Sequence, residues 1–344
     1  MAFSGYLPKL GKAYANLCLS VVRRAPLSLM PDFPCSSQDA RIVAVFATMN
    51  RREQALGCVR ALAAQSRPLA MLVVADNGSK DGTPAALRAL QGVPFPVLVH
   101  DMPENRGNAG GIQEAIEIAL AQGASAVWLL DDDSWPRPEA LEALLSAGIS
   151  DTQVCHPVQI EPVTGHLTWP VPLRDAKNQW LLATRLEHLP PGDAWESRPS
   201  WTGALIPRRI LERAGPVLGD LFIRGEDDEY SFRIAALGVK YMLVGKAVLD
   251  HPGAAQMEHL QFFGKHFFWE PNLPEWKLYY KIRNAVWLRI RNKSKWAGCA
   301  TAIVSVLAVC RYDRWSWLRC RVVGRALTDA WHGKLGRVIA PWAP

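Results

Sequence analysis

The feature that most constrains this chain is a series of short apolar runs that alternate with helix-like segments. The runs are rich in β-branched and other large apolar residues, and they are Ile42–Ala47, Met71–Ala75, Val97–His100 and Ala126–Leu130. Continuous apolar runs of this length are typical of strands buried on both faces, and strands that alternate with helices favour a parallel sheet. We therefore predict an α/β fold with a mostly parallel, Rossmann-like sheet flanked by helices.

Polar residues gather where three of these predicted strands end. Asp76–Ser79 follows the second run, the glycine-rich segment Asn105–Gly111 follows the third, and Asp131–Asp133 follows the fourth. In open parallel sheets, ligands bind beyond the carboxyl ends of the strands. The three segments are therefore expected to form one site.

The aspartate run is a candidate metal site. Asp131 and Asp133 are two positions apart, so on an extended segment their side chains point the same way. Mg²⁺ and Mn²⁺ prefer carboxylate oxygens, and the bound ion can also hold a diphosphate. His251 follows the predicted strand Val239–Leu249 and is a candidate third ligand. The alternatives are a solvated acidic turn and a structural histidine.

Three further segments offer groups for binding or catalysis. Asp76 and Asn77 can hydrogen-bond a nucleotide base or ribose, although their segment is also good turn sequence. Arg106 can face a phosphate. The run Glu226–Glu229 begins a predicted helix, where the helix dipole stabilises acidic side chains. One of its carboxylates is also a candidate general base.

Charge divides the chain into a mildly acidic body and a basic tail. The 344 residues carry a formal net charge of +7, but from Trp276 onward there are fourteen Lys and Arg against two Asp, with seven Trp. We expect three basic helices here, none long enough to span a membrane. They suit an anionic membrane interface, with packing on the body as the alternative. Nucleic-acid binding is not expected, because the body is acidic and carries no recognition motif.

These patterns divide the chain into three regions. Residues 1–40 are an N-terminal extension, residues 41–255 the α/β catalytic domain, and residues 256–344 a helical region that associates with a membrane. The seven cysteines include no C-x-x-C pair, so they are expected to be reduced thiols of a cytoplasmic protein. The predicted location is the cytoplasmic face of a membrane, as a peripheral protein.

Taken in order, the motifs resemble those of the family 2 glycosyltransferases with the GT-A fold. The resemblance extends from Arg41 to His251, with a weaker match over Tyr279–Asn284. It is carried by Phe46–Arg51, Asp76–Ser79, Asn105–Gly111, Asp131–Asp133 and Gly225–Arg233. Within the family, the chain looks most like the bacterial galactofuranosyl- and rhamnosyltransferases of cell-surface polysaccharides such as O-antigen.

The resemblance implies an inverting, metal-dependent transfer from UDP-galactofuranose to a hydroxyl of a glycan or a polyprenyl-diphosphate-linked acceptor. It implies Mn²⁺ or Mg²⁺ bound by Asp131, Asp133 and His251. Asp227 would be the catalytic base, with Asp228 as the other possible base. The implied donor-binding residues are Thr48, Arg51, Asp76, Asn77, Arg106 and Asp132, and the implied acceptor-binding residues are Trp201, Asp228 and Glu229.

Three other functions fit parts of the sequence. The first is a rhamnosyltransferase that uses dTDP-rhamnose. The second is a sugar nucleotidyltransferase, which usually has a glycine-rich phosphate loop directly after the first strand, where this chain has Thr48–Arg51. The third is a non-catalytic membrane-binding scaffold, which the retained Asp131, Asp133 and Asp227 disfavour.

Overall fold

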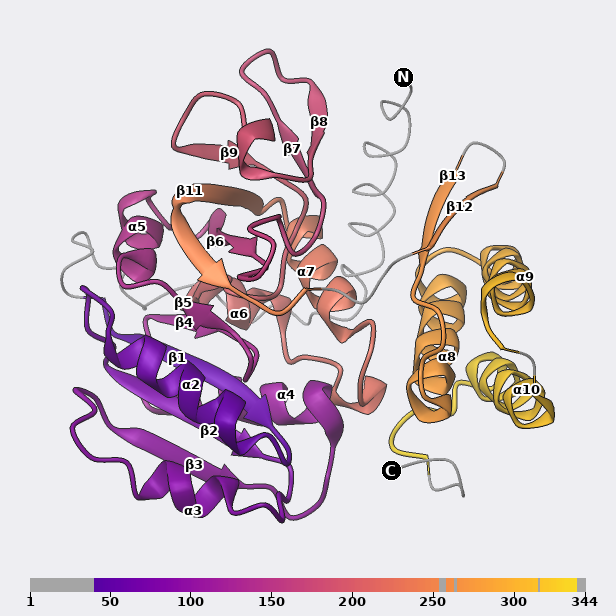
Figure 1. Ribbon diagram of the computed structural model, residues 1–344, viewed down its shortest axis with the longest axis horizontal. Helices are drawn as coiled ribbons and strands as arrows, with labels where there is room; N and C mark the ends of the chain where they lie inside the picture. The colour runs from indigo at the N-terminus through magenta and orange to yellow at the C-terminus, as the bar shows by residue number, and fades with distance from the viewer. Residues whose placement is uncertain (1–39, 254–257, 263–264, 315, 339–344) are drawn as a thin grey trace.

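The computed structural model describes residues 40–253, 258–262, 265–314 and 316–338, and Figure 1 shows an α/β body beside a group of C-terminal helices. The predicted extension lies outside these residues, apart from Ala40. The strands of the body are β1 (Ile42–Thr48), β2 (Met71–Asp76), β3 (Val97–Asp101), β4 (Ala126–Leu129), β5 (Trp135–Pro136), β6 (Gln153–Ile160), β7 (Val171–Arg174), β8 (Trp180–Ala183), β9 (Ala194–Glu196), β10 (Leu205–Pro207) and β11 (Lys240–Asp250). Its helices are α2 (Arg52–Ala63), α3 (Thr83–Arg88), α4 (Gly107–Ala121), α5 (Ala140–Ser146), α6 (Arg208–Ala214) and α7 (Glu226–Ala236), with short 3-10 turns at Leu186–His188 (η1) and Gly219–Leu221 (η2).

The central sheet has nine strands in the order β3-β2-β1-β4-β10-β6-β11-β5, with β9 paired to β11. The pairings give β1, β2, β3, β4, β6 and β11 a common direction, while β5, β9 and β10 run the opposite way. The prediction of a mostly parallel sheet is therefore confirmed. The antiparallel β10 inserts between β4 and β6 and separates two parallel groups.

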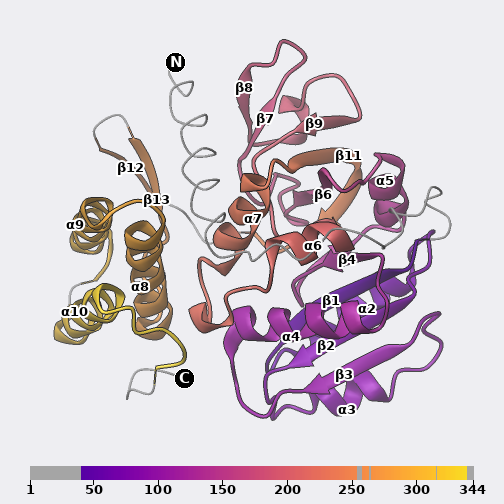
Figure 2. The ribbon, with the colours of Figure 1, turned by 180° about the vertical axis from the view of Figure 1, so that it is seen from behind.

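Both faces of the sheet are covered, as the continuous apolar strands predict. Alternate residues of β1 point to opposite faces: Phe46 packs in a core with α2, α3 and α5, whereas Val45 packs in a second core with α4, α6 and α7. Figure 1 shows α2 and α3 in front of the sheet, and Figure 2, from behind, shows α4 and α6 on the other side. This two-sided burial fixes the strands and leaves their carboxyl ends to carry polar groups.

The strand register aligns the polar ends of the first three strands. Thr48 is paired with Asp76, and Asp76 with Asp101, at the last positions of β1, β2 and β3. Leu129 of β4 pairs with Val45, so the aspartate run begins level with the end of β1. The predicted gathering of polar residues at one edge of the sheet is thus present.

The second half of the body differs from its sequence-based description in several elements. The several Pro and polar residues of segment 169–200 predict a long loop, but the segment contains the hairpin β7–β8 and the strand β9. The sequence also predicts a strand over Trp201–Ile206, whereas the observed strand, β10, is shorter and covers Leu205–Pro207. Helix α4 begins at Gly107, inside the glycine-rich turn rather than after it. The elements β5, α5 and β6 had no sequence-based prediction.

The C-terminal region consists of a hairpin followed by three helices. Its elements are β12 (Glu258–Phe262), β13 (Lys265–Trp269), α8 (Glu275–Asn292), α9 (Lys295–Tyr312) and α10 (Trp317–Trp331). The helices share a core that includes Tyr279, Tyr280 and Val322. Across the part of the chain that the structure describes, no helix combines the length and apolar character needed to cross a membrane. The three predicted basic helices are present as α8, α9 and α10.

Candidate active site

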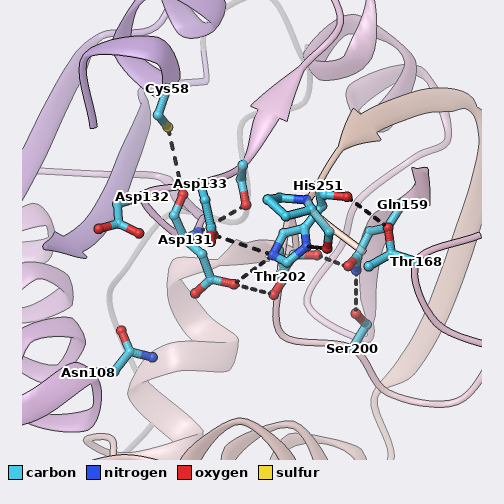
Figure 3. Close-up of polar contacts among 12 residues, drawn as sticks. Cys58, Asn108, Asp131, Asp132, Asp133, Gln159, Thr168, Ser200, Thr202 and His251 are labelled. Atoms are coloured by element: carbon cyan, nitrogen blue, oxygen red, sulfur yellow. Dashed lines mark hydrogen bonds and ion pairs between the residues drawn. The ribbon is translucent and has the colours of Figure 1, made fainter. Parts of the chain in front are cut away.

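Asp131, Asp133 and His251 form a candidate metal centre at the carboxyl edge of the sheet. One ligand atom from each lies within 4.8 Å of the others. His251 Nε2 is 3.8 Å from Asp131 Oδ2 and 3.5 Å from Asp133 Oδ1, and Figure 3 shows the three side chains converging. Two carboxylates and an imidazole fit Mn²⁺ or Mg²⁺ in charge and ligand type, since hard cations prefer oxygen ligands.

Strand pairing explains how His251 reaches the aspartates from 118 positions away along the chain. The chain leaves the aspartate run as β5, which pairs antiparallel with the end of β11, so that Trp135 faces Asp250. Arg137 reinforces this pairing with two hydrogen bonds to the Asp250 carboxylate, of 3.0 and 3.2 Å. His251, the next residue, is thereby placed beside the run. Thr202 Oγ1 also donates a 2.6 Å hydrogen bond to Asp131 Oδ2.

Asp132, between the two candidate ligands, faces away from His251 (Figure 3). It is buried and accepts a 2.8 Å hydrogen bond from Thr48 Oγ1. Arg51 bridges it to the next residue, with Nη1 2.9 Å from Asp132 and Nη2 2.6 Å from Asp133. Burial raises the pKa of Asp132 to about 7, although Arg51 opposes this rise, and Asp133 adds to it. The run therefore divides, as the alternation of side chains predicts, into two candidate ligands that face His251 and one buried residue, Asp132, that faces Thr48 and Arg51.

Asp76 and Asn77 lie at the end of β2, and both are buried. Asp76 Oδ2 accepts hydrogen bonds from the backbone N–H groups of Gly78 and Ser79, at 3.1 and 2.9 Å. Its other oxygen, Oδ1, is buried and has no hydrogen-bond partner among the described residues. A buried acceptor without a partner is costly, so this oxygen is suited to a ligand donor.

The glycine-rich turn is held to the body by its neighbours on both sides. Asn77 accepts a hydrogen bond from the Arg106 N–H, at 3.1 Å, and donates one to the Gly107 carbonyl, at 3.2 Å. Gly107 has a φ of +69°, and a Cβ there would lie 2.1 Å from the Phe222 carbonyl oxygen. The glycine is therefore required by the close approach of the loop that precedes α7.

The structure does not bring Arg106 to the aspartates. Its guanidinium lies along α4, 2.7 Å from Glu114 and 3.4 Å from Gln113. The arginine that contacts the aspartate run is Arg51, at the start of α2. A donor-binding role for Arg106 stays a prediction.

The acidic run at the start of α7 presents its carboxylates in different environments. Asp227 and Asp228 are exposed, and Asp228 pairs with Arg198 at 3.1 Å. The surrounding protein nevertheless limits the hydration of the Asp227 carboxylate, and Asp228 and Asp131 add negative charge, so its pKa is raised, while Arg224 opposes the rise. The charge of Asp131, a candidate metal ligand, is thus one cause of the raised pKa of this candidate base.

Glu226 and Glu229 of the same run are buried. Glu226 accepts a 3.1 Å hydrogen bond from Asn108 Nδ2, and its pKa is raised by burial and by the charge of Asp227. Glu226 is not among the residues that the family resemblance implies for the site, and its only signal in the sequence is its place after Gly225 at the start of a predicted helix. Glu229 pairs with Arg233 through two hydrogen bonds, of 2.7 and 3.0 Å.

Trp201, implied as an acceptor-binding residue, is also buried. Its ring meets Tyr230 edge to face, with centroids 5.9 Å apart, inside the core formed with α4 and α6. The structure therefore places Trp201 and Glu229 in packing and ion-pair contacts. Their roles toward an acceptor stay predictions.

Two buried residues of α8 fix the loop that leads into the acidic helix. Asn284 Nδ2 donates hydrogen bonds to the carbonyls of Leu221, Ile223 and Arg224. Arg283 donates to the Leu221 carbonyl at 2.9 Å and to the Asn284 side chain at 2.8 Å. They belong to the weakly matching Tyr279–Asn284 segment, whose role the sequence analysis left open. The C-terminal helices thus position the backbone directly before Asp227.

Comparison with known proteins agrees with this arrangement. Residues 44–212 match the model of glycosyl transferase family 2. The chain is 28% identical over 219 residues to galactofuranosyltransferase GlfT1 of Mycolicibacterium smegmatis, a match that covers 61% of this chain and 70% of that protein. It is 26% identical over 298 residues to GlfT1 of Mycobacterium tuberculosis, covering 83% of this chain and 95% of that protein.

A solved structure confirms the predicted GT-A fold. The chain is similar to GalNAc-T7 with UDP, GalNAc and Mn²⁺, with a TM-score of 0.50 and 15% identity. The match covers 85% of this chain but 58% of that structure, so this chain spans less than two thirds of its length. At this identity the similarity establishes the fold alone.

Proposed function

We propose that this chain, a member of glycosyl transferase family 2, moves galactofuranose from UDP-galactofuranose to an acceptor hydroxyl with inversion of configuration. The observation that carries the proposal is that two carboxylates and an imidazole converge at one edge of the sheet. The charge of Asp131 also contributes to the raised pKa of Asp227. The names of the similar curated proteins favour galactofuranose as the sugar. The acceptor we propose is a lipid-linked or polysaccharide glycan of the bacterial cell surface.

The donor nucleotide is proposed to bind at the ends of β1 and β2. The partnerless, buried Asp76 Oδ1 is suited to accept a hydrogen bond from the ring N–H of uracil. Thymine offers the same N–H, so this oxygen does not separate UDP-galactofuranose from dTDP-rhamnose, the donor of the second candidate function. Thr48 and Arg51 are less available as direct donor ligands, since both already contact Asp132.

The diphosphate is proposed to lie at Asp131, Asp133 and His251, which would hold Mn²⁺ or Mg²⁺. The bound ion supplies positive charge that stabilises the departing nucleotide diphosphate. Arg51, whose guanidinium lies 2.6 Å from Asp133, is placed to add charge from the protein. Asp132 anchors this arrangement through Thr48 and Arg51.

Asp227 is the proposed general base. It accepts the proton of the acceptor hydroxyl as that oxygen attacks the anomeric carbon on the face opposite the nucleotide. The carbon–oxygen bond to the diphosphate breaks in the same displacement, which inverts the centre. No carboxylate nucleophile is required, in contrast to a retaining mechanism. The raised pKa of Asp227 improves its strength as a base while the carboxylate is ionised.

A donor panel tests this function. The protein with Mn²⁺ is offered UDP-galactofuranose, UDP-galactopyranose and dTDP-rhamnose separately, and release of UDP or dTDP is measured with and without EDTA. We expect release from UDP-galactofuranose that EDTA abolishes. Release from dTDP-rhamnose alone would support the second candidate function, and release from UDP-galactopyranose alone would overturn the proposed donor.

The helices α9 and α10 are proposed to bind an anionic membrane surface, at the cytoplasmic face of the inner membrane. Their exposed apolar residues include Trp296, which is 85% exposed, and Trp317, which is 80% exposed. Others are Ile303, Leu307, Leu318 and Trp331. Exposed basic residues border them: Lys293, Lys295, Arg311, Arg314 and Arg321. Both ribbon views place α9 and α10 on the side of α8 away from the body (Figures 1 and 2). Tryptophan and basic residues together favour an anionic lipid interface.

Replacing Trp296 and Trp317 together by serine is expected to weaken binding to phosphatidylglycerol vesicles by about tenfold or more, since each ring loses its apolar contact with lipid. Cosedimentation at low salt measures the effect. Trp169→Ser is the matched control, because Trp169 is 42% exposed but belongs to the body. Equal binding by all three proteins would contradict a membrane role for these helices.

A further inference from the structure

A group of cationic side chains lies where α8 meets the loop before the acidic helix α7. Arg224 belongs to that loop, two residues before Glu226, and Lys277 and Lys281 are one turn apart on the same side of α8. We call these three residues the junction cations. The proposed mechanism uses none of them.

The junction cations lie on elements that touch each other, because Asn284 of α8 donates a hydrogen bond to the Arg224 carbonyl, and Lys281 and Lys277 are three and seven positions before Asn284 on the same helix. The pKa values of Lys277 and Lys281 are both lowered, first by burial and also by the charge of Arg224. Glu270 pairs with Arg224 at 2.7 Å, and its charge opposes the lowering of both lysine pKa values. Asp313 also acts on Lys281, but it already accepts a 2.6 Å hydrogen bond from the Asn272 N–H.

The two lysines lie against aromatic rings rather than carboxylates. Lys281 Nζ is 4.3 Å from the centre of the Trp269 ring, and Lys277 Nζ is 5.3 Å from that of Trp276. Within the described ranges, neither ammonium forms an ion pair at 4 Å or less. Partly buried like charges repel, so such an arrangement is most stable when an anion binds among them.

Backbone geometry supports a built site. Arg224 has a φ of +72°, which is unfavourable for a residue with a side chain, and it is followed by Gly225 with a φ of +93°. Asn284 holds the Arg224 carbonyl by a hydrogen bond at 2.6 Å. The same helix, α8, therefore supplies both lysines and the group that fixes the third cation.

The position of the junction cations relates them to the acceptor side of the reaction. The charge of Arg224 acts on Asp227, the proposed base, and the charge of Asp131 acts on the same carboxylate. Asp227 is three residues after Arg224, so the proposed base and one junction cation belong to the same short segment. The charge of Arg51, which contacts the aspartate run, contributes to the lowered pKa of Lys277. Because the donor diphosphate is assigned to the metal centre, an anion at the junction cations belongs to the second substrate.

We propose that Arg224, Lys277 and Lys281 form a subsite for a phosphate or diphosphate group carried by the acceptor. The inference rests on the proposed function, which it deepens by naming the chemistry of the acceptor near its reactive hydroxyl. Two lysines and an arginine match a diphosphate in charge and in hydrogen-bond donors. The nearby exposed face of α9 and α10 leaves a place for the lipid part of such an acceptor.

The first test measures anion binding without catalysis. Inorganic pyrophosphate is titrated calorimetrically into the full chain in EDTA, so that no metal ion can hold it at the aspartates. We expect Lys277→Gln/Lys281→Gln to weaken binding by at least about tenfold. The control Lys293→Gln/Lys295→Gln removes the same charge from exposed positions and should leave binding within about twofold. Equal losses in both double variants, or no loss in the first, would overturn the subsite.

The second test identifies the source of the phosphate. We compare an acceptor glycan on a prenyl diphosphate with the same glycan on a phosphate-free alkyl chain. Lys277→Gln/Lys281→Gln should raise KM about tenfold or more for the first acceptor only, with the donor KM unchanged. If the donor KM rises, the cations bind the donor. If binding to phosphatidylglycerol vesicles is lost while the acceptor KM stays unchanged, the cations bind a lipid headgroup. Either result overturns the proposal. Absence of transfer from every sugar nucleotide would instead overturn the proposed function, while pyrophosphate binding still reports on the subsite.

Discussion

Asp227→Asn is expected to reduce glycosyl transfer by about 10²- to 10⁴-fold while leaving donor binding nearly unchanged, because the amide keeps the shape of the side chain but cannot take a proton. Asp227 is exposed, and the charges of both Asp131 and Arg224 affect its pKa. Turnover with a saturating acceptor measures the first effect, and calorimetric titration with UDP measures the second.

Asp228→Asn is the matched control, because it makes the same change at the next residue. Asp228 is also exposed, but it forms an ion pair with Arg198. We expect this variant to keep most of its turnover and to change the acceptor KM at most. Full activity in Asp227→Asn together with a large loss in Asp228→Asn would exchange the two roles, which the sequence left open.

The pH profile gives a second measurement on the same residue. A general base must be deprotonated, so transfer falls as the pH drops through its pKa. Because limited hydration and the charges of Asp228 and Asp131 raise the pKa of Asp227, while Arg224 opposes them, the fall should begin at a higher pH than for an ordinary aspartate. In Asp227→Asn, the remaining slow transfer should no longer fall in this acidic pH range. If the same fall persists in the variant, it is caused by the titration of another group.

The first half of the fold was predictable because local signals and tertiary packing agree there. The apolar runs in β1, β2 and β4 are buried on both faces, and the run in β3 is half-buried at the edge of the sheet. Each run therefore predicts a strand from its own residues, and each ends at the polar residues that the register aligns. Pairings between distant segments could not be read in this way. The strand β5 has two residues, and β10 has three and runs against its neighbours, so neither carries a periodic signal.

The same distinction explains which site residues the sequence identified. Asp131 and Asp133 were evident from their spacing after a strand, whereas His251 became convincing only through the family resemblance. Its place beside them depends on the pairing of β5 with β11, a contact between segments more than a hundred residues apart. Arg283 and Asn284 were equally hidden, because a polar pair inside a basic helix looks like a solvated face until its partners, the carbonyls before α7, are known.

Removing one of the proposed metal ligands is expected to have the other large effect, and the aspartate run supplies its own control. Second-sphere changes commonly cost 10- to 100-fold in metal affinity, so Asp131→Asn, Asp133→Asn or His251→Gln should weaken Mn²⁺ binding by at least about 100-fold. Transfer at low Mn²⁺ should fall in parallel. Titration followed by the electron paramagnetic resonance of free Mn²⁺ measures affinity directly, without dependence on either substrate.

Asp132→Asn makes the same chemical change between the two ligands, but its carboxylate faces Thr48 and Arg51 rather than His251. Since burial already raises the pKa of Asp132 to about 7, an uncharged amide there resembles a state that the native side chain reaches near neutral pH. We therefore expect Mn²⁺ affinity to change by less than about tenfold in this variant. Loss of Mn²⁺ in Asp132→Asn equal to that in its neighbours would mean that the three carboxylates act as one acidic patch, and the assignment of two ligands and one anchor would then be wrong.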